Sequence, residues 1–230
     1  MAPDRIEAVL LDMGGVLVPE VTSYEPVTRD PDLVAALREL GVDAPEVCII
    51  ERTNRLRDAY RALNTACTQP DIDQVWSDTP APVRKLLLQA LRRQETQRAY
   101  SYAREVVASI ARRYRLGIVS NNIIPGDQHA RALRRAGILE HIGCALWSAN
   151  TGHRKPDPTM IHAVLARLRV PHRRAIFIGD KLRTDIAAAR AAGVRSVYLK
   201  KRDAPDEARV KPDFTLRDLR ELPLLLQRLH

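Results

Sequence analysis

The chain has 230 residues, 45% of them hydrophobic and 4% aromatic, and it carries a formal net charge of +9. This apolar content supports a folded core and excludes an intrinsically disordered chain, and no apolar run reaches the roughly 18 residues that a membrane span needs. Three widely separated cysteines, Cys48, Cys67 and Cys144, fit neither a disulfide framework nor a zinc site. Because no signal peptide precedes the first apolar run, we expect a cytoplasmic protein with reduced thiols.

The positive charge comes from arginines that are dispersed along predicted helices. Four of them, Arg52, Arg55, Arg57 and Arg61, fall in one helical stretch, where solvated helix faces are the default interpretation and a pocket wall is the alternative. No helix-turn-helix, zinc-finger or RNA-binding signature accompanies this charge, so it favours attraction of small anionic substrates over nucleic-acid binding. The sequence does not indicate an oligomeric state.

Short apolar runs predict strands that are buried on both faces, as in a parallel sheet. The runs are 8–11, 116–119, 175–178 and 197–199, with 144–147 as a weaker fifth candidate. Helical patterns lie between them at 125–137, 158–168 and 185–192. This alternation of strand and helix predicts a doubly wound, Rossmann-like α/β sheet. The tail at 213–230 is expected to place a last helix on the edge of the sheet.

Residues 19–100 differ because they contain helical patterns and no convincing strand. Asp30 is expected to cap a helix that ends at Gly41, and further helices fit 45–63 and 82–98. We therefore expect a helical cap domain at 19–100. It would be inserted into an α/β core domain that is formed by residues 1–18 and 101–230.

Polar side chains directly follow three of the predicted strands. They are Asp12, the run Ser120-Asn121-Asn122, and Asp180 after Gly179. In open α/β sheets, functional groups collect outside the carboxyl ends of the strands, and right-handed crossovers bring these ends to one edge. Lys155 lies in a loop before a predicted helix and is expected to reach the same edge.

Four segments resemble, in order, the four motifs of the haloacid dehalogenase (HAD) superfamily. VLLDMGGVL (9–17) is similar to the strand that ends in DxDG[TV][LV], and IVSNN (118–122) to the strand that ends in Ser or Thr. GHRKPDP (152–158) resembles the motif centred on a lysine, and IFIGDKLRTDI (176–186) resembles GDxxxxD. The four segments occur in the family's order, and their spacing is close to the spacing usual in the family. The helical insertion matches the subgroup with a cap after the first motif.

This resemblance implies a magnesium-dependent phosphatase that forms an aspartyl-phosphate on Asp12. Lys155 would neutralise charge between the nucleophile and the phosphoryl group, while the Ser120 hydroxyl and the backbone N–H of Asn121 would hold the phosphoryl oxygens. The implied substrate is a small phosphorylated metabolite, for example a sugar phosphate. No membrane or nucleic-acid partner is expected.

The resemblance also implies which oxygens would hold Mg²⁺. They belong to Asp12, the backbone carbonyl of Gly14 and Asp180, with Asp185 acting directly or through water. Taken singly, Asp12 is also consistent with a strand-end turn, and Asp185 with a charge at a helix N-terminus.

The sequence departs from the family at Gly14, where the usual phosphatase has a second Asp that acts as general acid and base. The proton would then come from water, from the substrate, or from Glu20 or His153. Three alternatives remain beside a phosphatase: a dehalogenase that needs no magnesium, a catalytically impaired HAD module that binds a ligand or partner, and a receiver domain. The joint presence of Asp12, Lys155 and Asp180 favours the phosphatase.

Overall fold

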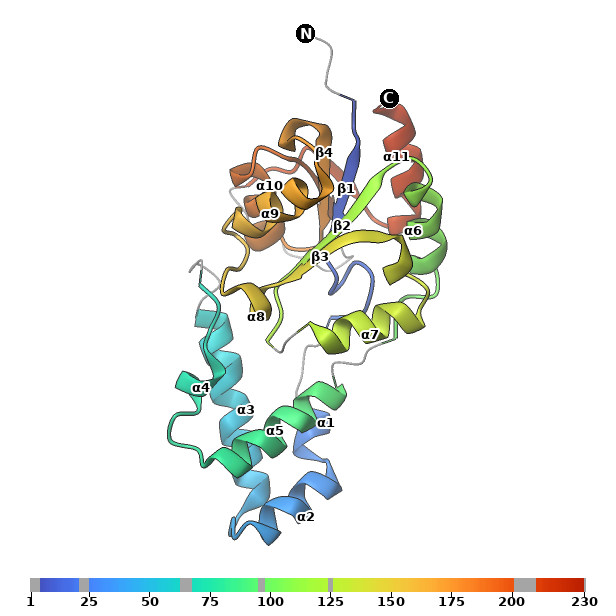
Figure 1. The fold of residues 1–230 in the computed structure, drawn as a ribbon. Coiled ribbons are helices and arrows are strands. Elements are labelled where there is room, and N and C mark those ends of the chain that lie inside the picture. The colour runs from blue at the N-terminus through green and yellow to red at the C-terminus, as the bar shows by residue number, and fades with distance from the viewer. Residues whose placement is uncertain are drawn as a thin grey trace.

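The computed structural model describes residues 5–20, 25–62, 68–94, 98–123, 126–200 and 210–229. Its centre is a six-stranded parallel sheet with the order β3-β2-β1-β4-β5-β6. The strands are β1 (Ala8–Leu11), β2 (Arg115–Ser120), β3 (Ile142–Trp147), β4 (Ala175–Gly179), β5 (Arg195–Leu199) and β6 (Phe214–Leu216). Helices cover both faces of this sheet (Figure 1), which confirms the predicted doubly wound α/β fold.

Strand β1 shows why its residues form a central strand. All four of its side chains are fully buried; Val9 and Leu11 belong to one apolar cluster, and Ala8 and Leu10 belong to another. Successive side chains of a strand point to opposite faces, so a strand that is covered on both sides has a continuous apolar sequence. The helices that contribute to these two clusters are α6 (Ala103–Ala111), α7 (Asp127–Arg135) and α11 (Leu222–Arg228) on one face and α9 (Thr159–Leu168) and α10 (Ala187–Ala191) on the other.

The segment between β1 and α6 forms a separate bundle of helices (Figure 1). Asp30 caps its second helix as predicted, because the Asp30 carboxylate accepts the backbone N–H groups of Asp32 and Leu33 at 3.1 Å. The bundle has its own apolar cluster around Trp76. Its helices are α1 (Glu25–Thr28), α2 (Pro31–Glu39), α3 (Pro45–Ala62), α4 (Ile72–Val75) and α5 (Ala81–Gln94). The division into domains at residues 19 and 100 stays a prediction.

Trp76 is expected to be a main source of stability in this bundle. Its side chain is fully buried, and its indole N–H donates to the backbone oxygen of Arg52 at 2.9 Å. Trp76→Ala is expected to lower the free energy of unfolding by about 3–5 kcal/mol, because the cavity left behind adds to the lost burial. Val47 in α3 is 53% exposed, and Val47→Ala should change the same quantity by less than about 0.5 kcal/mol. Equal denaturation midpoints for Trp76→Ala and wild type would contradict this prediction.

Two of the differences from the sequence-based expectation lie at the end of a helix and in the tail. The predicted helix at 82–98 ends at Gln94, with residues 95–97 outside the described part of the chain. The tail contains strand β6 before helix α11, whereas only the helix was expected. This strand has three residues and only one buried side chain, so it has no apolar pattern of its own. It is held by pairing with β5 and by Asp213, whose carboxylate accepts both the backbone N–H and the hydroxyl of Ser196 at 2.7 Å.

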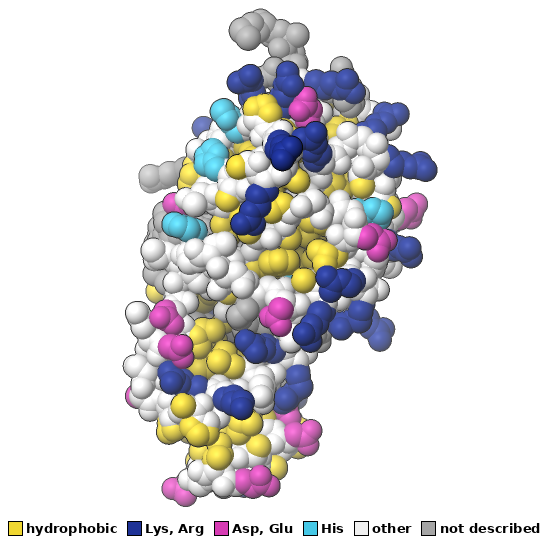
Figure 2. Space-filling view, viewed as in Figure 1, with side chains coloured by type: hydrophobic (Ala, Val, Ile, Leu, Met, Phe, Trp, Pro, Cys, Tyr) yellow, Lys and Arg dark blue, Asp and Glu magenta, His cyan; other side chains and the backbone are white. Residues whose placement is uncertain are grey.

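The basic side chains are spread over the surface and have acidic neighbours. On the face shown in Figure 2, Lys and Arg lie over both the sheet and the helical bundle, with Asp and Glu between them. Arg52 and Arg55 both donate to Asp78, at 2.9 and 2.8 Å. Within the described part of the chain, helices that combine the length and the apolarity of a bilayer span are absent.

Candidate active site

A cavity of about 140 Å³ opens at the carboxyl ends of β1, β2 and β4. This is the region where the strand order reverses, and ligands of open α/β sheets bind at such switch points. The predicted site residues all meet here. Those that line the cavity are Asp12, Gly14, Ser120, Asn121, Lys155 and Asp185, and Asp180 belongs to the same carboxylate cluster.

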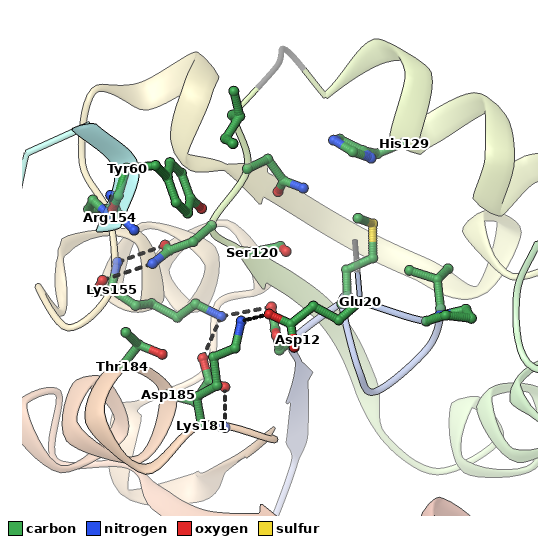
Figure 3. A pocket seen from close by; sticks show the side chains of 17 residues that line it. Asp12, Glu20, Tyr60, Ser120, His129, Arg154, Lys155, Lys181, Thr184 and Asp185 are labelled. Carbon is green, nitrogen blue, oxygen red and sulfur yellow. Dashed lines mark hydrogen bonds and ion pairs between the residues drawn. The ribbon is translucent and has the colours of Figure 1, made fainter. Parts of the chain in front are cut away.

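Lys155 is the centre of the site (Figure 3). Its Nζ lies 2.8 Å from Asp12 Oδ1 and 2.8 Å from Asp185 Oδ1, and it donates to the backbone oxygen of Val119 at 2.8 Å. Burial disfavours the charge of this side chain, which is 1% exposed, but the two carboxylates outweigh that effect and raise the pKa of Lys155. Lys155 is therefore a fixed cation between two carboxylates.

The backbone of Lys155 is tied to the end of β2 by a reciprocal pair of hydrogen bonds. The Lys155 N–H donates to Asn121 Oδ1 at 2.9 Å, and Asn121 Nδ2 donates to the Lys155 carbonyl at 2.8 Å. The side chain of Asn121 thus fixes the lysine loop. The preceding residue, Ser120, is buried and lines the cavity together with Asn121.

Asp185 is held by both of its oxygens. Oδ1 pairs with Lys155, and Oδ2 accepts the backbone N–H groups of Asp180 at 3.1 Å and Lys181 at 2.9 Å. Burial raises the pKa of Asp185, and Lys155 acts against this shift. The carboxylate also packs directly on Gly179, where an added Cβ would lie 2.2 Å from the Asp185 Cβ. Only glycine permits this approach.

The carboxylates of Asp12, Asp180 and Asp185 are arranged so that a cation fits between them. All three side chains are buried, and one oxygen of each lies within 4.8 Å of the others. Hard divalent cations such as Mg²⁺ prefer carboxylate oxygens. The ammonium groups of Lys155 and Lys181 do not balance these three carboxylates together with that of Glu20. Because both oxygens of Asp185 are already engaged, Asp12 and Asp180 are better placed as direct ligands.

Of the two side chains considered as proton sources, Glu20 lines the cavity and His153 does not. Glu20 lines the cavity and pairs with Lys181, with Glu20 Oε1 and Lys181 Nζ 2.5 Å apart. His153 is exposed and does not line the cavity; its backbone forms an isolated bridge with Thr68. The suggestion that His153 supplies the proton is not supported by this position.

The wall next to the helical bundle contains a buried arginine that the sequence analysis did not single out. Arg154 is 1% exposed, its guanidinium lies 4.1 Å from the centre of the Tyr60 ring, and Nη1 donates to the backbone oxygen of Tyr60 at 3.2 Å. Gln69 adds a second link, because its Nε2 donates to the backbone oxygen of Asn122 at 2.7 Å. The bundle is thus bound to the loop that carries Lys155. Arg52, Arg55, Arg57 and Arg61 do not line the cavity.

The parallel sheet and the lysine-bridged carboxylates at its carboxyl edge define an α/β protein with a candidate active site at the strand ends. The sequence pattern of haloacid dehalogenase-like hydrolases matches residues 6–193, and the chain therefore belongs to that family. This confirms the resemblance of its four motifs.

Known proteins with similar sequence and structure agree with this family. A phosphoserine phosphatase from Thermus thermophilus is 30% identical over 143 residues, which are 62% of this chain and 57% of that relative. The match thus spans little more than half of the relative's length. Two similar structures share 23% identity with this chain, a level that shows the fold alone. They are a 2-haloacid dehalogenase from Pseudomonas syringae (TM-score 0.64, 98% of this chain and 100% of the other) and a HAD phosphatase from Thermococcus onnurineus (TM-score 0.65, 96% and 98%).

Proposed function

We propose that the protein is a magnesium-dependent phosphatase that removes phosphate from a small phosphorylated metabolite through an aspartyl-phosphate on Asp12. The observation that carries this proposal is the buried Lys155, which bridges Asp12 and Asp185 at 2.8 Å in the cavity at the strand ends. The phosphoserine phosphatase among the relatives supports it. Such a site provides a nucleophile, a fixed positive charge and hydrogen-bond donors within one cavity.

In the first step, an Asp12 oxygen attacks phosphorus and the bond to the leaving oxygen breaks. Lys155 offsets the repulsion between the carboxylate and the phosphate, and Ser120 and the Asn121 N–H hold phosphoryl oxygens. In the second step, water attacks the phosphorus of the aspartyl-phosphate, which releases inorganic phosphate and restores Asp12.

Asp12, Asp180 and the Gly14 carbonyl would hold Mg²⁺, and Asp185 would orient Lys155 and the loop at Asp180. When bound, the cation supplies positive charge that stabilises the charge on the transferring group. This set of buried carboxylates favours a phosphatase over a dehalogenase, since the dehalogenase branch needs no magnesium.

The proposal predicts a strict dependence on the cation. We expect the protein to release phosphate from members of a panel of phosphorylated metabolites when Mg²⁺ is present. The rate should fall to background in chelator and return when Mg²⁺ is added back. Asp180→Asn should raise the Mg²⁺ concentration needed for half-maximal rate and weaken Mg²⁺ binding in calorimetry, because one carboxylate ligand is lost. Undiminished turnover in metal-free buffer would contradict the proposed role of magnesium.

A further inference from the structure

The cavity has no carboxylate where the usual phosphatase has its general acid. Gly14 lines the cavity, and a Cβ added at this position would meet no atom within 4 Å. There is therefore open space where a side chain at this position would begin. A general acid contributes about 10²–10⁴ in rate when the leaving group needs a proton. Hydrolysis in this cavity must therefore proceed without a general acid at position 14.

The same cavity is lined by a charged pair, Lys181 and Glu20. Both line the cavity, and the pair lies beside Asp12 (Figure 3). The two side chains are 48% and 34% exposed, so a substrate in the cavity can reach them. Arg154 lines the opposite wall with Tyr60 (Figure 3) and lies farther from Asp12 in this view.

Lys181 is placed to act as a positive charge. Its ammonium lines the cavity and is held by the ion pair with Glu20. A cation held in this position can stabilise the negative charge that develops on a neighbouring oxygen.

We propose that Lys181, oriented by Glu20, binds the leaving oxygen of the substrate, and that the substrate is a phosphate whose leaving group departs as a stable anion. Acyl phosphates and phosphoanhydrides have this chemistry, because a carboxylate or a phosphate leaves. The inference rests on the proposed function and specifies its substrate class.

The atoms balance without an added acid. A new bond joins an Asp12 oxygen to phosphorus, and the bond from phosphorus to the leaving oxygen breaks with its electron pair on that oxygen. The leaving group departs as an anion beside the Lys181 ammonium. In the second step, the oxygen of the attacking water bonds to phosphorus and both of its protons leave with the released phosphate, while the electron pair of the broken bond returns to the Asp12 carboxylate.

The first test compares leaving groups on the wild-type protein with Mg²⁺. Acetyl phosphate and pyrophosphate represent the two sources of an anionic leaving group, and phosphoserine and glycerol phosphate represent alkyl esters. We expect kcat/KM for at least one of the first two to exceed that for the alkyl esters by about 10²-fold or more. A series of aryl phosphates should show rates that fall steeply as the leaving-group pKa rises.

The second test removes the charge of Lys181. Lys181→Met is expected to lower kcat about 10²-fold on acetyl phosphate or pyrophosphate. In the aryl phosphate series, the rate of this variant should depend more steeply on leaving-group pKa than the wild-type rate does. Lys181→Arg should restore part of the rate. Glu20→Gln should lower kcat by less than Lys181→Met, with little change in KM, because Glu20 acts only through the position of Lys181. Lys85 is exposed in α5, and Lys85→Met is the matched control, expected to leave rates and slope unchanged.

The third test places an acid in the open space. Gly14→Asp is expected to raise the rate on alkyl phosphates by about 10²-fold and to change the rate on acetyl phosphate and pyrophosphate little. The inference would be overturned if wild-type rates were equal across leaving groups. It would also be overturned if Lys181→Met lowered the rate without changing its dependence on leaving-group pKa. Either result would leave the proposed phosphatase function intact. Failure to hydrolyse any phosphate ester or anhydride would overturn both.

Discussion

Replacing Asp12 by Asn is expected to reduce phosphate release by at least about 10⁴-fold, while the protein stays folded. An amide oxygen is a poor nucleophile toward phosphorus, and the neighbouring Asp185 has both oxygens engaged by Lys155 and two backbone N–H groups. Asn has nearly the same volume as Asp and can still accept from Lys155 Nζ, so the local packing is preserved. Initial rates with Mg²⁺ and circular dichroism of the two proteins check both parts of this prediction.

The control for this change is an aspartate that does not face the cavity. Asp127 is exposed in the first turn of α7, and Asp127→Asn should retain the wild-type rate. An aspartyl-phosphate trapped in wild type and absent from Asp12→Asn would assign the covalent step to this residue. Phosphate release by Asp12→Asn at a near wild-type rate would remove Asp12 from the mechanism.

The central strands and the main site contacts follow from local sequence patterns. A strand with both faces covered, such as β1, has an unbroken apolar run that ends where its first polar residue begins, and that residue is Asp12. Three such runs end at the same edge, which is enough to predict that Asp12, Ser120 and Asp180 lie near one another. Predicting the contact between Lys155 and Asp12 requires the motif pattern as well, since 143 positions separate these two residues.

The wall beside the helical bundle could not be predicted in this way. Arg154 and Tyr60 are 94 positions apart, and their contact depends on how the bundle sits on the sheet. That placement follows from tertiary contacts such as the one between Gln69 and Asn122, for which a single sequence gives no periodic pattern. The same reason applies to β6, whose three residues are held by β5 and not by an apolar pattern.

The difference between Glu20 and His153 also has a structural cause. After β1 the chain folds back in a tight turn, in which the Gly15 N–H donates to the Val18 oxygen at 2.7 Å. Gly15 has φ of 78°, a conformation that glycine adopts without strain. This turn brings Glu20 back to the cavity, whereas the loop at His153 faces the bundle. Both residues were candidates from the sequence, and only the backbone geometry shows that Glu20, and not His153, reaches the cavity.

Lys155→Met is expected to remove activity and also to destabilise the protein. The ammonium of Lys155 forms ion pairs with the buried Asp12 and Asp185, and removing one member of a buried ion pair costs about 3–5 kcal/mol. Methionine fills similar space and can still pack on Phe177, whose ring lies 5.2 Å from Lys155 Nζ. Denaturant unfolding in chelator measures this loss. Added Mg²⁺ should reduce it, because a cation between the carboxylates offsets part of the missing charge.

A double variant separates the stability of the site from its chemistry. Lys155→Met combined with Asp185→Asn removes one positive and one negative charge together, so the free energy of unfolding in chelator should recover relative to Lys155→Met alone. Phosphate release should stay at background, because the repulsion between Asp12 and the substrate phosphate is no longer offset by a lysine. If Lys155→Met unfolds in chelator at the wild-type denaturant concentration, Lys155 does not compensate the buried carboxylates. If the double variant regains turnover, charge balance alone, and not the lysine, is what the chemistry requires.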